Sequence, residues 1–124
     1  MTQVLELFGT SVTVPNIEKT SQFYRQIYPY DEVKSGVFAG INYIALLRAG
    51  EVGVCVFEQG EGNPLAESFP TFRVESVAAY ADEVQATGGS ILLPTNQCPC
   101  TAAPFAICAD QDGHQFMIKE ARAQ

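Results

Sequence analysis

The chain has 124 residues, of which 47% are hydrophobic and 17% are charged, so it is long enough for one folded domain and too apolar to be disordered. The net charge of −7, from 14 acidic and 7 basic side chains, argues against a nucleic-acid-binding protein, which needs a basic surface. It favours a soluble protein with a cationic ligand. The single histidine, His114, excludes a metal site built from several histidines.

The first half of the chain predicts one strand, one helix and three further strands. Residues 7–14 alternate loosely and are rich in Phe, Val and Thr, which is typical of a strand. Asn16 is the predicted N-cap of a helix over residues 17–27, where apolar side chains recur at helical spacing. Further strands are predicted at residues 36–38, 42–47 and 52–57, and residues 59–64 have the composition of a loop.

The second half repeats this order. A strand is predicted at residues 69–74, Ser76 caps a helix that ends at Gly88-Gly89, and strands follow at 90–93, 105–109 and 115–119. Val14-Pro15-Asn16-Ile17 recurs as Val74-Glu75-Ser76-Val77. The sequence therefore predicts an α+β fold in a single domain over residues 1–124. Two βαβββ modules, at about residues 1–60 and 67–121, form a cleft-bearing mixed sheet.

Three stretches of the sequence, in this order and spacing, resemble a known family. They are residues 14–17 with 23–30 (Phe-Tyr-Arg-Gln-Ile-Tyr-Pro-Tyr), residues 72–89 with their closing glycine pair, and residues 110–117 (Asp-Gln-Asp-Gly-His-Gln-Phe-Met). Together they resemble the vicinal oxygen chelate superfamily of glyoxalase I, bleomycin-resistance proteins and extradiol dioxygenases. Tyr28-Pro29 departs from the family's Leu-Gly, and Gln111 departs from its Pro.

The resemblance implies a divalent metal held by side chains at four inward-facing strand positions. Counted from the matching motifs, these positions are Gly9, Val54, Phe69 and Met117. None of these side chains is a ligand for a hard or borderline cation. A shift of the count by one residue adds only the thiol of Cys55. We therefore expect no metal site and no cofactor.

Strand alternation predicts which side chains face the cleft between the modules. The predicted inner faces carry Leu7, Gly9, Ser11, Thr13, Val54, Val56, Glu58, Phe69, Thr71, Arg73, Gln115, Met117 and Lys119. The opposite faces, predicted to pack under the helices, carry Phe8, Val12, Val14, Phe72, Val74, Phe116 and Ile118. Apolar walls with a few convergent polar groups are typical of a small-molecule pocket. The predicted ligand-binding residues are Leu7, Gly9, Tyr43, Val54, Glu58, Phe69, Arg73 and Met117.

Several of these residues have an alternative structural role. Val54, Phe69 and Met117 could fill the cleft as core, and Arg73 could pair with Glu58 rather than with a ligand. Four tyrosines are candidates for a stacking wall against a planar ligand: Tyr24, Tyr28, Tyr30 and Tyr43. The alternative for Tyr24 is helix-to-sheet packing, and the alternative for Tyr28 and Tyr30, which follow the helix, is an interface.

His114 and the paired cysteines have local interpretations. His114 is predicted to be a turn residue that tolerates the left-handed region, in preference to a general base. Cys98 and Cys100 are predicted to lie in a loop over the cleft mouth, because their spacing matches neither a thioredoxin-type nor a zinc motif. The sequence does not identify a catalytic residue.

The resulting hypothesis is a metal-independent protein that sequesters a flat or cationic small molecule, similar to bleomycin-resistance proteins. The alternative is a divergent lyase or dioxygenase, with Glu6, Glu58 or Glu120 as unconventional metal ligands, or with Glu58 or Tyr43 acting as acid–base without a metal. A third possibility is a structural dimer with a filled cleft. We expect a homodimer because the sheet edges need partners. We also expect a cytoplasmic location, because four cysteines occur without a signal peptide, and no membrane span, because Gly and Pro interrupt the longest uncharged stretch.

Overall fold

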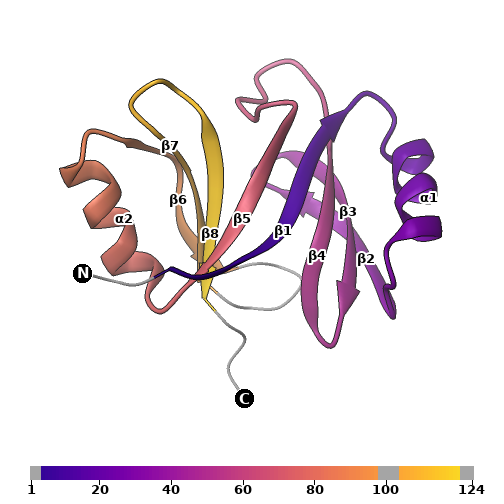
Figure 1. Cartoon of the computed structure of the whole chain (residues 1–124). Coiled ribbons are helices and arrows are strands. Elements are labelled where there is room, and N and C mark those ends of the chain that lie inside the picture. Colours follow the sequence, from indigo (N-terminus) through magenta and orange to yellow (C-terminus); the bar gives the residue numbers. More distant parts are fainter. Residues whose placement is uncertain (1–3, 98–103, 121–124) are drawn as a thin grey trace.

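The computed structural model describes residues 4–97 and 104–120, and the order of its elements confirms the predicted α+β fold (Figure 1). The first module contains β1 (Val4–Val14), α1 (Ile17–Ile27), β2 (Glu32–Phe38), β3 (Ile41–Arg48) and β4 (Glu51–Glu58). The second module contains β5 (Ser68–Val74), α2 (Val77–Ala86), β6 (Ser90–Gln97), β7 (Pro104–Ala109) and β8 (Gln115–Glu120). Cys98 and Cys100 lie outside the described residues.

The described strands form one curled, mixed sheet that joins the two modules. Their order is β2-β3-β4-β1-β5-β8-β7-β6, so that β1 and β5 pair antiparallel at the centre. Each of these two strands pairs in parallel with the last strand of its own module, β1 with β4 and β5 with β8. Helices α1 and α2 cover the outer face of the sheet at its two sides (Figure 1). β2 and β6 are the edge strands among the described residues.

The capping residues predicted from the sequence begin both helices. The Asn16 side chain accepts the Lys19 N–H at 3.1 Å, and the Ser76 hydroxyl accepts the Ala79 N–H at 3.2 Å. Helix α2 has a further cap that the sequence does not reveal, since Glu120 at the end of β8 accepts the Val77 N–H at 2.9 Å. Neither described helix is long and apolar enough to cross a membrane.

A β-bulge at Gly53 moves three predicted cleft residues, Val54, Val56 and Glu58, to the outer face. Val54 pairs with Leu46, whereas Val52 pairs with the next residue of β3, so that Gly53 is extra and the alternation shifts. Val54 and Val56 consequently pack under α1 instead of facing the cleft. A Cβ on Gly53 would overlap the hydroxyl of Tyr28, so a larger residue at this bulge requires the Tyr28 ring to move.

A second irregularity, in β1, exchanges the faces predicted for Leu7 and Phe8. Leu7 pairs with Phe72, which faces α2, while Gly9 pairs with Thr71. Residues directly opposite in an antiparallel pair share a face, so Leu7 lies on the outer side and is 66% exposed. Phe8 lies on the inner side, where its ring contacts the cationic groups of Arg73 and Lys119. The prediction was therefore wrong for both residues.

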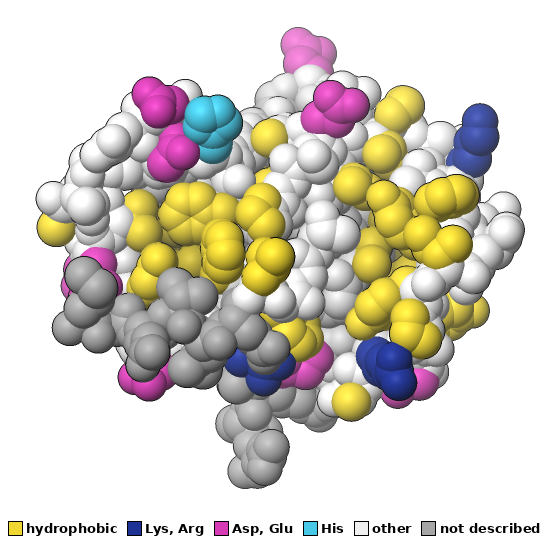
Figure 2. Space-filling view, in the orientation of Figure 1, with side chains coloured by type: hydrophobic (Ala, Val, Ile, Leu, Met, Phe, Trp, Pro, Cys, Tyr) yellow, Lys and Arg dark blue, Asp and Glu magenta, His cyan; other side chains and the backbone are white. Residues whose placement is uncertain are grey.

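The chain carries a net charge of −7, and one face of the molecule shows how its charged side chains are distributed. On the face shown in Figure 2, Lys and Arg side chains are separated from one another and form no continuous basic area. Hydrophobic side chains reach the surface in several places, and the large exposed ones are Leu7, Phe23, Ile27, Tyr30 and Val37.

Candidate functional site

The space between the two modules, predicted to be a cleft that is either open or filled by core residues, is filled by packed side chains. The inner faces of both modules contribute to one buried cluster: Ile41, Tyr43, Ala45, Leu47, Cys55, Phe57, Leu65, Phe69, Phe105 and Ile107. The rings of Phe57 and Phe69 stack with centroids 6.3 Å apart, and Met117 packs against the cluster. The structure thus places Tyr43, Phe69 and Met117 in a hydrophobic core, as the alternative interpretation of Phe69 and Met117 expects.

The four strand positions at which the resemblance implies metal ligands do not form a suitable donor set. Gly9, Phe69 and Met117 occupy three of them, and the bulge puts Cys55 rather than Val54 on the inner face. A Cβ on Gly9 would lie 2.5 Å from the carbonyl oxygen of Gly53, so no larger residue fits there without displacing β4. Carboxylate and imidazole ligands are missing from all four positions, and these residues do not fit a divalent metal.

Arg73 belongs to a polar cluster at one end of this core. Its guanidinium lies 3.7 Å from the carboxylate of Glu51 and 4.5 Å from the centroid of the Phe8 ring. The ammonium of Lys119, a residue only 4% exposed, lies 4.9 Å from the same ring. Arg73 is therefore paired internally, as one alternative expects, but its partner is Glu51 and not Glu58.

The tyrosines do not gather into a stacking wall. Tyr24 and Tyr28 pack between α1 and the sheet, while Tyr43 is buried in the core between the modules. Burial raises the pKa of Tyr28, and the nearby Arg48 guanidinium only partly offsets this effect. Tyr30, beyond the end of α1, is exposed. The packing interpretation is correct for Tyr24; Tyr28 is likewise half-buried under α1, and Tyr43 is buried in the core.

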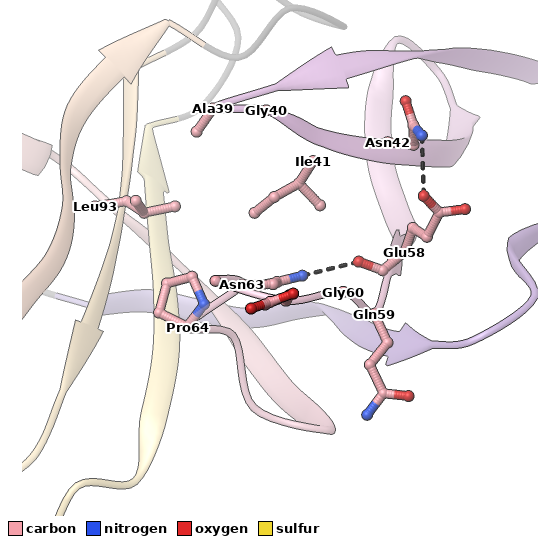
Figure 3. Close-up of a pocket in the computed structure, with 12 residues that line it drawn as sticks. Ala39, Gly40, Ile41, Asn42, Glu58, Gln59, Gly60, Asn63, Pro64 and Leu93 are labelled. Atoms are coloured by element: carbon pink, nitrogen blue, oxygen red, sulfur yellow. Dashed lines mark hydrogen bonds between the residues drawn. The ribbon is translucent and has the colours of Figure 1, made fainter.

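One pocket among the described residues opens at the end of the core opposite Arg73 (Figure 3). Its volume of about 360 Å³ lies within the range of small-molecule sites. Its walls are formed by the β2–β3 turn with the start of β3, by the end of β4 with the loop that follows it, and by β6. The lining residues are Ala39, Gly40, Ile41, Asn42, Glu58, Gln59, Gly60, Glu61, Gly62, Asn63, Pro64 and Leu93.

Hydrogen bonds from both modules hold the loop that forms one wall of this pocket. The Asn63 side chain donates to the Glu58 carbonyl at 2.8 Å and accepts the Leu65 N–H at 2.9 Å. From β8, the amide of Gln115 donates to the Pro64 carbonyl at 2.8 Å and accepts the Ala66 N–H at 2.6 Å. The wall is therefore anchored on its C-terminal side, and the second module helps to shape the pocket.

Glu58 is the only predicted ligand-binding residue that lines the pocket. Its carboxylate accepts a hydrogen bond from the Asn42 side chain at 3.0 Å (Figure 3). The sequence-based reasoning missed Asn42, Glu61 and Leu93. The signal that could have found them is the Gly-, Asn- and Pro-rich stretch at residues 59–64, since such loops carry function when a rigid scaffold positions them.

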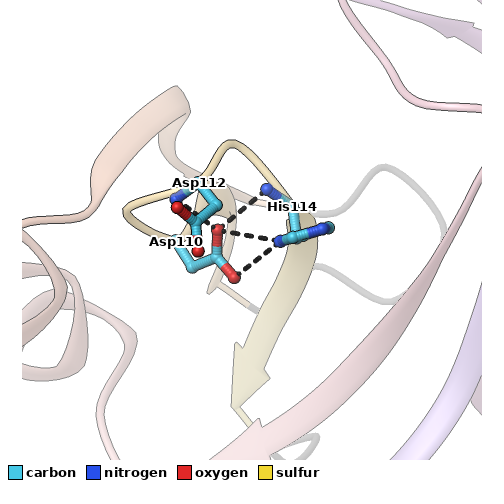
Figure 4. A network of polar contacts seen from close by, with 3 residues as sticks. All are labelled: Asp110, Asp112 and His114. Atoms are coloured by element: carbon cyan, nitrogen blue, oxygen red, sulfur yellow. Dashed lines mark hydrogen bonds and ion pairs between the residues drawn. The ribbon is translucent and has the colours of Figure 1, made fainter.

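The turn between β7 and β8 contains an exposed cluster of Asp110, Asp112 and His114 (Figure 4). The N–H groups of His114 and Asp112 both donate to the Asp110 carboxylate at 2.9 Å, and the His114 ring lies 3.1 Å from it. These bonds lower the pKa of Asp110, and the bond from the backbone N–H of His114 has the largest effect. His114 is thus a turn residue, but the left-handed conformation belongs to Gly113, with φ +91°. The bonds within this cluster close the turn.

Comparison with known families and structures agrees with this architecture. The family model described as Glyoxalase/Bleomycin resistance protein/Dioxygenase superfamily matches residues 6–118. No curated protein matches the sequence significantly.

Several solved structures share the fold at low sequence identity. Methylmalonyl-CoA epimerase from Mycobacterium tuberculosis has a TM-score of 0.71 and 12% identity, with 97% of this chain and 90% of that chain covered. A Streptomyces coelicolor methylmalonyl-CoA epimerase variant in complex with 2-nitronate-propionyl-CoA has a TM-score of 0.70 and 13% identity, covering 98% and 100%. A hypothetical protein from Bacillus halodurans has a TM-score of 0.69 and 17% identity, covering 96% of each chain. At these identities the likeness concerns the fold alone.

Proposed function

This chain belongs to the glyoxalase/bleomycin resistance protein/dioxygenase superfamily, and on that premise we propose that it binds a small organic cation without a metal ion. The observation that carries the proposal is the pocket at the end of the core, whose lining residues are mostly apolar or neutral, include the acidic residues Glu58 and Glu61, and include no lysine or arginine. Opposite charge and enclosed apolar surface together favour an organic cation.

Two further observations support binding at this pocket rather than at the metal position of the superfamily. The residues at that position do not form a donor set for a divalent cation. The space around them is occupied by the packed rings of Phe57, Phe69 and Phe105. A ligand of useful size therefore requires another opening, and the pocket supplies about 360 Å³.

A titration with organic cations tests this proposal. Aliphatic and flat aromatic cations, each with a neutral analogue, are added to protein labelled with ¹⁵N, and amide shifts are followed. We expect cations to shift residues of the β4–β5 loop and the β2–β3 turn, and Leu93→Ala to weaken binding. Because Leu93 contributes to the lining, the exposed Val37→Ala is the control. Silence of these residues with every probe contradicts the proposal.

The absence of a metal requires its own measurement. Elemental mass spectrometry of untagged protein, purified without chelator and then incubated with Ni, Zn, Mn and Fe, is expected to give less than stoichiometric metal. Stoichiometric metal would contradict the donor-set argument and would favour the alternative of a divergent lyase or dioxygenase. That alternative otherwise depends on superfamily membership alone.

On the same footing, we propose a cytoplasmic homodimer that binds no nucleic acid. The edge strands β2 and β6 offer backbone groups for pairing with a second chain. Cys55 and Cys108 are buried and form no disulfide among the described residues, which suits a reducing compartment. The net charge of −7 and the separated basic side chains on the face shown in Figure 2 support the absence of nucleic-acid binding. Light scattering should give twice the chain mass, and a DNA or RNA mobility shift should be negative.

A further inference from the structure

The two acidic residues of the pocket lining belong to different parts of the structure. Glu58 is the last residue of β4 and pairs with Val14, so its side chain lies on the outer face of the sheet, where Val14 packs under α1. Asn42, whose amide binds the Glu58 carboxylate, lies on the same face, because its neighbour Tyr43 is buried on the inner face. The Glu58 carboxylate is therefore directed away from the inner side of the pocket.

The inner side of the pocket is apolar. Ile41 belongs to the buried cluster between the modules, and Leu93 packs against the same cluster. In Figure 3, these two side chains lie apart from the hydrogen-bonded pair of Asn42 and Glu58. A ligand whose apolar body contacts Ile41 and Leu93 therefore needs a partner for its charge other than the Glu58 carboxylate.

Glu61 supplies the other carboxylate of the lining. It follows β4 in the loop, beyond the strand alternation that places the Glu58 side chain on the outer face. Glu61 is exposed, and its side chain has no hydrogen bond or ion pair with another residue in the described part of the chain. Both of its carboxylate oxygens can therefore accept from a ligand without the loss of an existing bond.

The backbone on both sides of Glu61 is anchored. On the N-terminal side, the Gln59 N–H donates to the last carbonyl of β1 at 2.7 Å. On the C-terminal side, the Asn63 N–H donates to the Gly60 carbonyl at 3.1 Å and closes a turn. Gly62 adopts φ +81° in this turn, a conformation that favours glycine. A carboxylate on an anchored turn loses less conformational freedom when it binds a ligand.

We propose that Glu61 is the residue that selects a cation in this pocket, with its carboxylate against the positive group of the ligand. The apolar body of the ligand lies against Ile41 and Leu93. This assignment rests on the proposed function, because it names the specificity-determining residue of the same pocket. Glu58 has a structural role in this arrangement, since its carboxylate joins β4 to β3 through Asn42.

Two pairs of probes test this role of Glu61: cyclohexylamine with cyclohexanol, and benzylamine with benzyl alcohol. In each pair the amine is a cation at neutral pH, and the alcohol has the same apolar body without the charge. Each probe is titrated into ¹⁵N-labelled protein at low ionic strength, where an exposed charge pair is screened least. The backbone amide shifts of Ile41 and Gly62 report on the pocket. We expect both amines to bind more tightly than their alcohols, and Glu61→Gln to reduce this preference about threefold.

Two variants that remove the same charge elsewhere complete the comparison. Glu58→Gln should reduce the preference less than Glu61→Gln, because the carboxylate that it removes lies on the outer face. Glu18→Gln should leave the preference unchanged, since Glu18 is exposed on α1 and lies outside the lining. A loss in either variant as large as that in Glu61→Gln would overturn the role of Glu61.

The remaining outcomes separate the role of Glu61 from the proposed function. If Glu61→Gln keeps the full preference, the role of Glu61 is overturned, while the proposed function stands because the pocket still selects a cation. A pocket that responds equally to amines and alcohols, or to none of them, also overturns this role. The proposed function then stands only if other organic cations shift the pocket signals, and silence with every organic cation overturns both.

Discussion

Truncation of Phe69 measures whether the space between the modules is a filled core or an open cleft. Phe69 is 2% exposed, and its ring stacks on Phe57 at a centroid distance of 6.3 Å. Replacement of a buried Phe by Ala costs roughly 3–5 kcal/mol, because apolar contacts are lost and a cavity remains. We therefore expect Phe69→Ala to lower the free energy of unfolding by about 4 kcal/mol, a large part of the 5–15 kcal/mol of a typical domain.

Urea unfolding followed by circular dichroism is the assay, with the slope m compared between variants to confirm two-state behaviour. Phe23→Ala is the matched control, since Phe23 lies on α1 with 57% of its surface exposed. This control should change stability by less than about 1 kcal/mol. If Phe69→Ala is too unstable to fold, Phe69→Leu should still cost roughly 1–2 kcal/mol. A loss below about 1 kcal/mol for Phe69→Ala, with m unchanged, would refute the filled core.

Three further predictions concern local backbone and charge. Gly53→Ala should destabilise the protein by about 1–3 kcal/mol in urea unfolding, because the new Cβ would overlap the Tyr28 hydroxyl. Adding Tyr28→Phe removes this hydroxyl and should recover part of the loss. Independent effects of the two changes on stability would contradict the contact. Ala49 adopts φ +53°, a left-handed conformation that asparagine tolerates better than alanine. Ala49→Asn should therefore raise the free energy of unfolding by about 0.5–1 kcal/mol, whereas the same change at Ala78, exposed on α2, should lower it. A loss of stability at both positions would contradict backbone strain at Ala49. Backbone N–H groups hold the pKa of Asp110 below its ordinary value of 3.8, so its contribution to stability is complete above that value and disappears as the pH falls through the lowered folded-state pKa. Asp110→Asn should therefore lower Tm at neutral pH and converge with the unmodified protein at the acid end, and a constant difference across the pH range would disprove this.

The repeated order of elements was predictable because each signal for it is local. Asn16 and Ser76 each cap a helix whose apolar residues recur at helical spacing, so both helix starts are confirmed. The glycines at the turns likewise separate the strands in the sequence. Two features are long-range, namely the pairing of β1 with β5 and the capping of the α2 N-terminus by Glu120. A single sequence contains no local signal for either.

The facing of individual strand residues was predictable only as far as the alternation is regular. The prediction is correct for Phe69, Thr71 and Arg73, whose strand pairs with β8 without a shift of register. It was wrong for Val54 and for Leu7, because each lies next to a bulge in which one extra residue exchanges the two faces. At the bulge in β4, Tyr28 packs over Gly53, which lies 25 positions later in the chain. A glycine in a strand sequence does not by itself distinguish a bulge from a regular strand position.

The location of the candidate site follows from the same packing. When the metal-ligand positions carry Phe and Met, their side chains meet those of the other module, and the cleft closes around a hydrophobic cluster. The remaining opening lies where the inner faces end and loops take over, between Ala39 and Leu93. Loops carry the polar groups that a buried sheet face excludes, which is why Glu61 and Asn63 are in the lining of this pocket, beside Glu58 at the end of β4. The sequence shows the loss of the metal ligands directly, whereas the transfer of the site to the loop follows only from the packed structure.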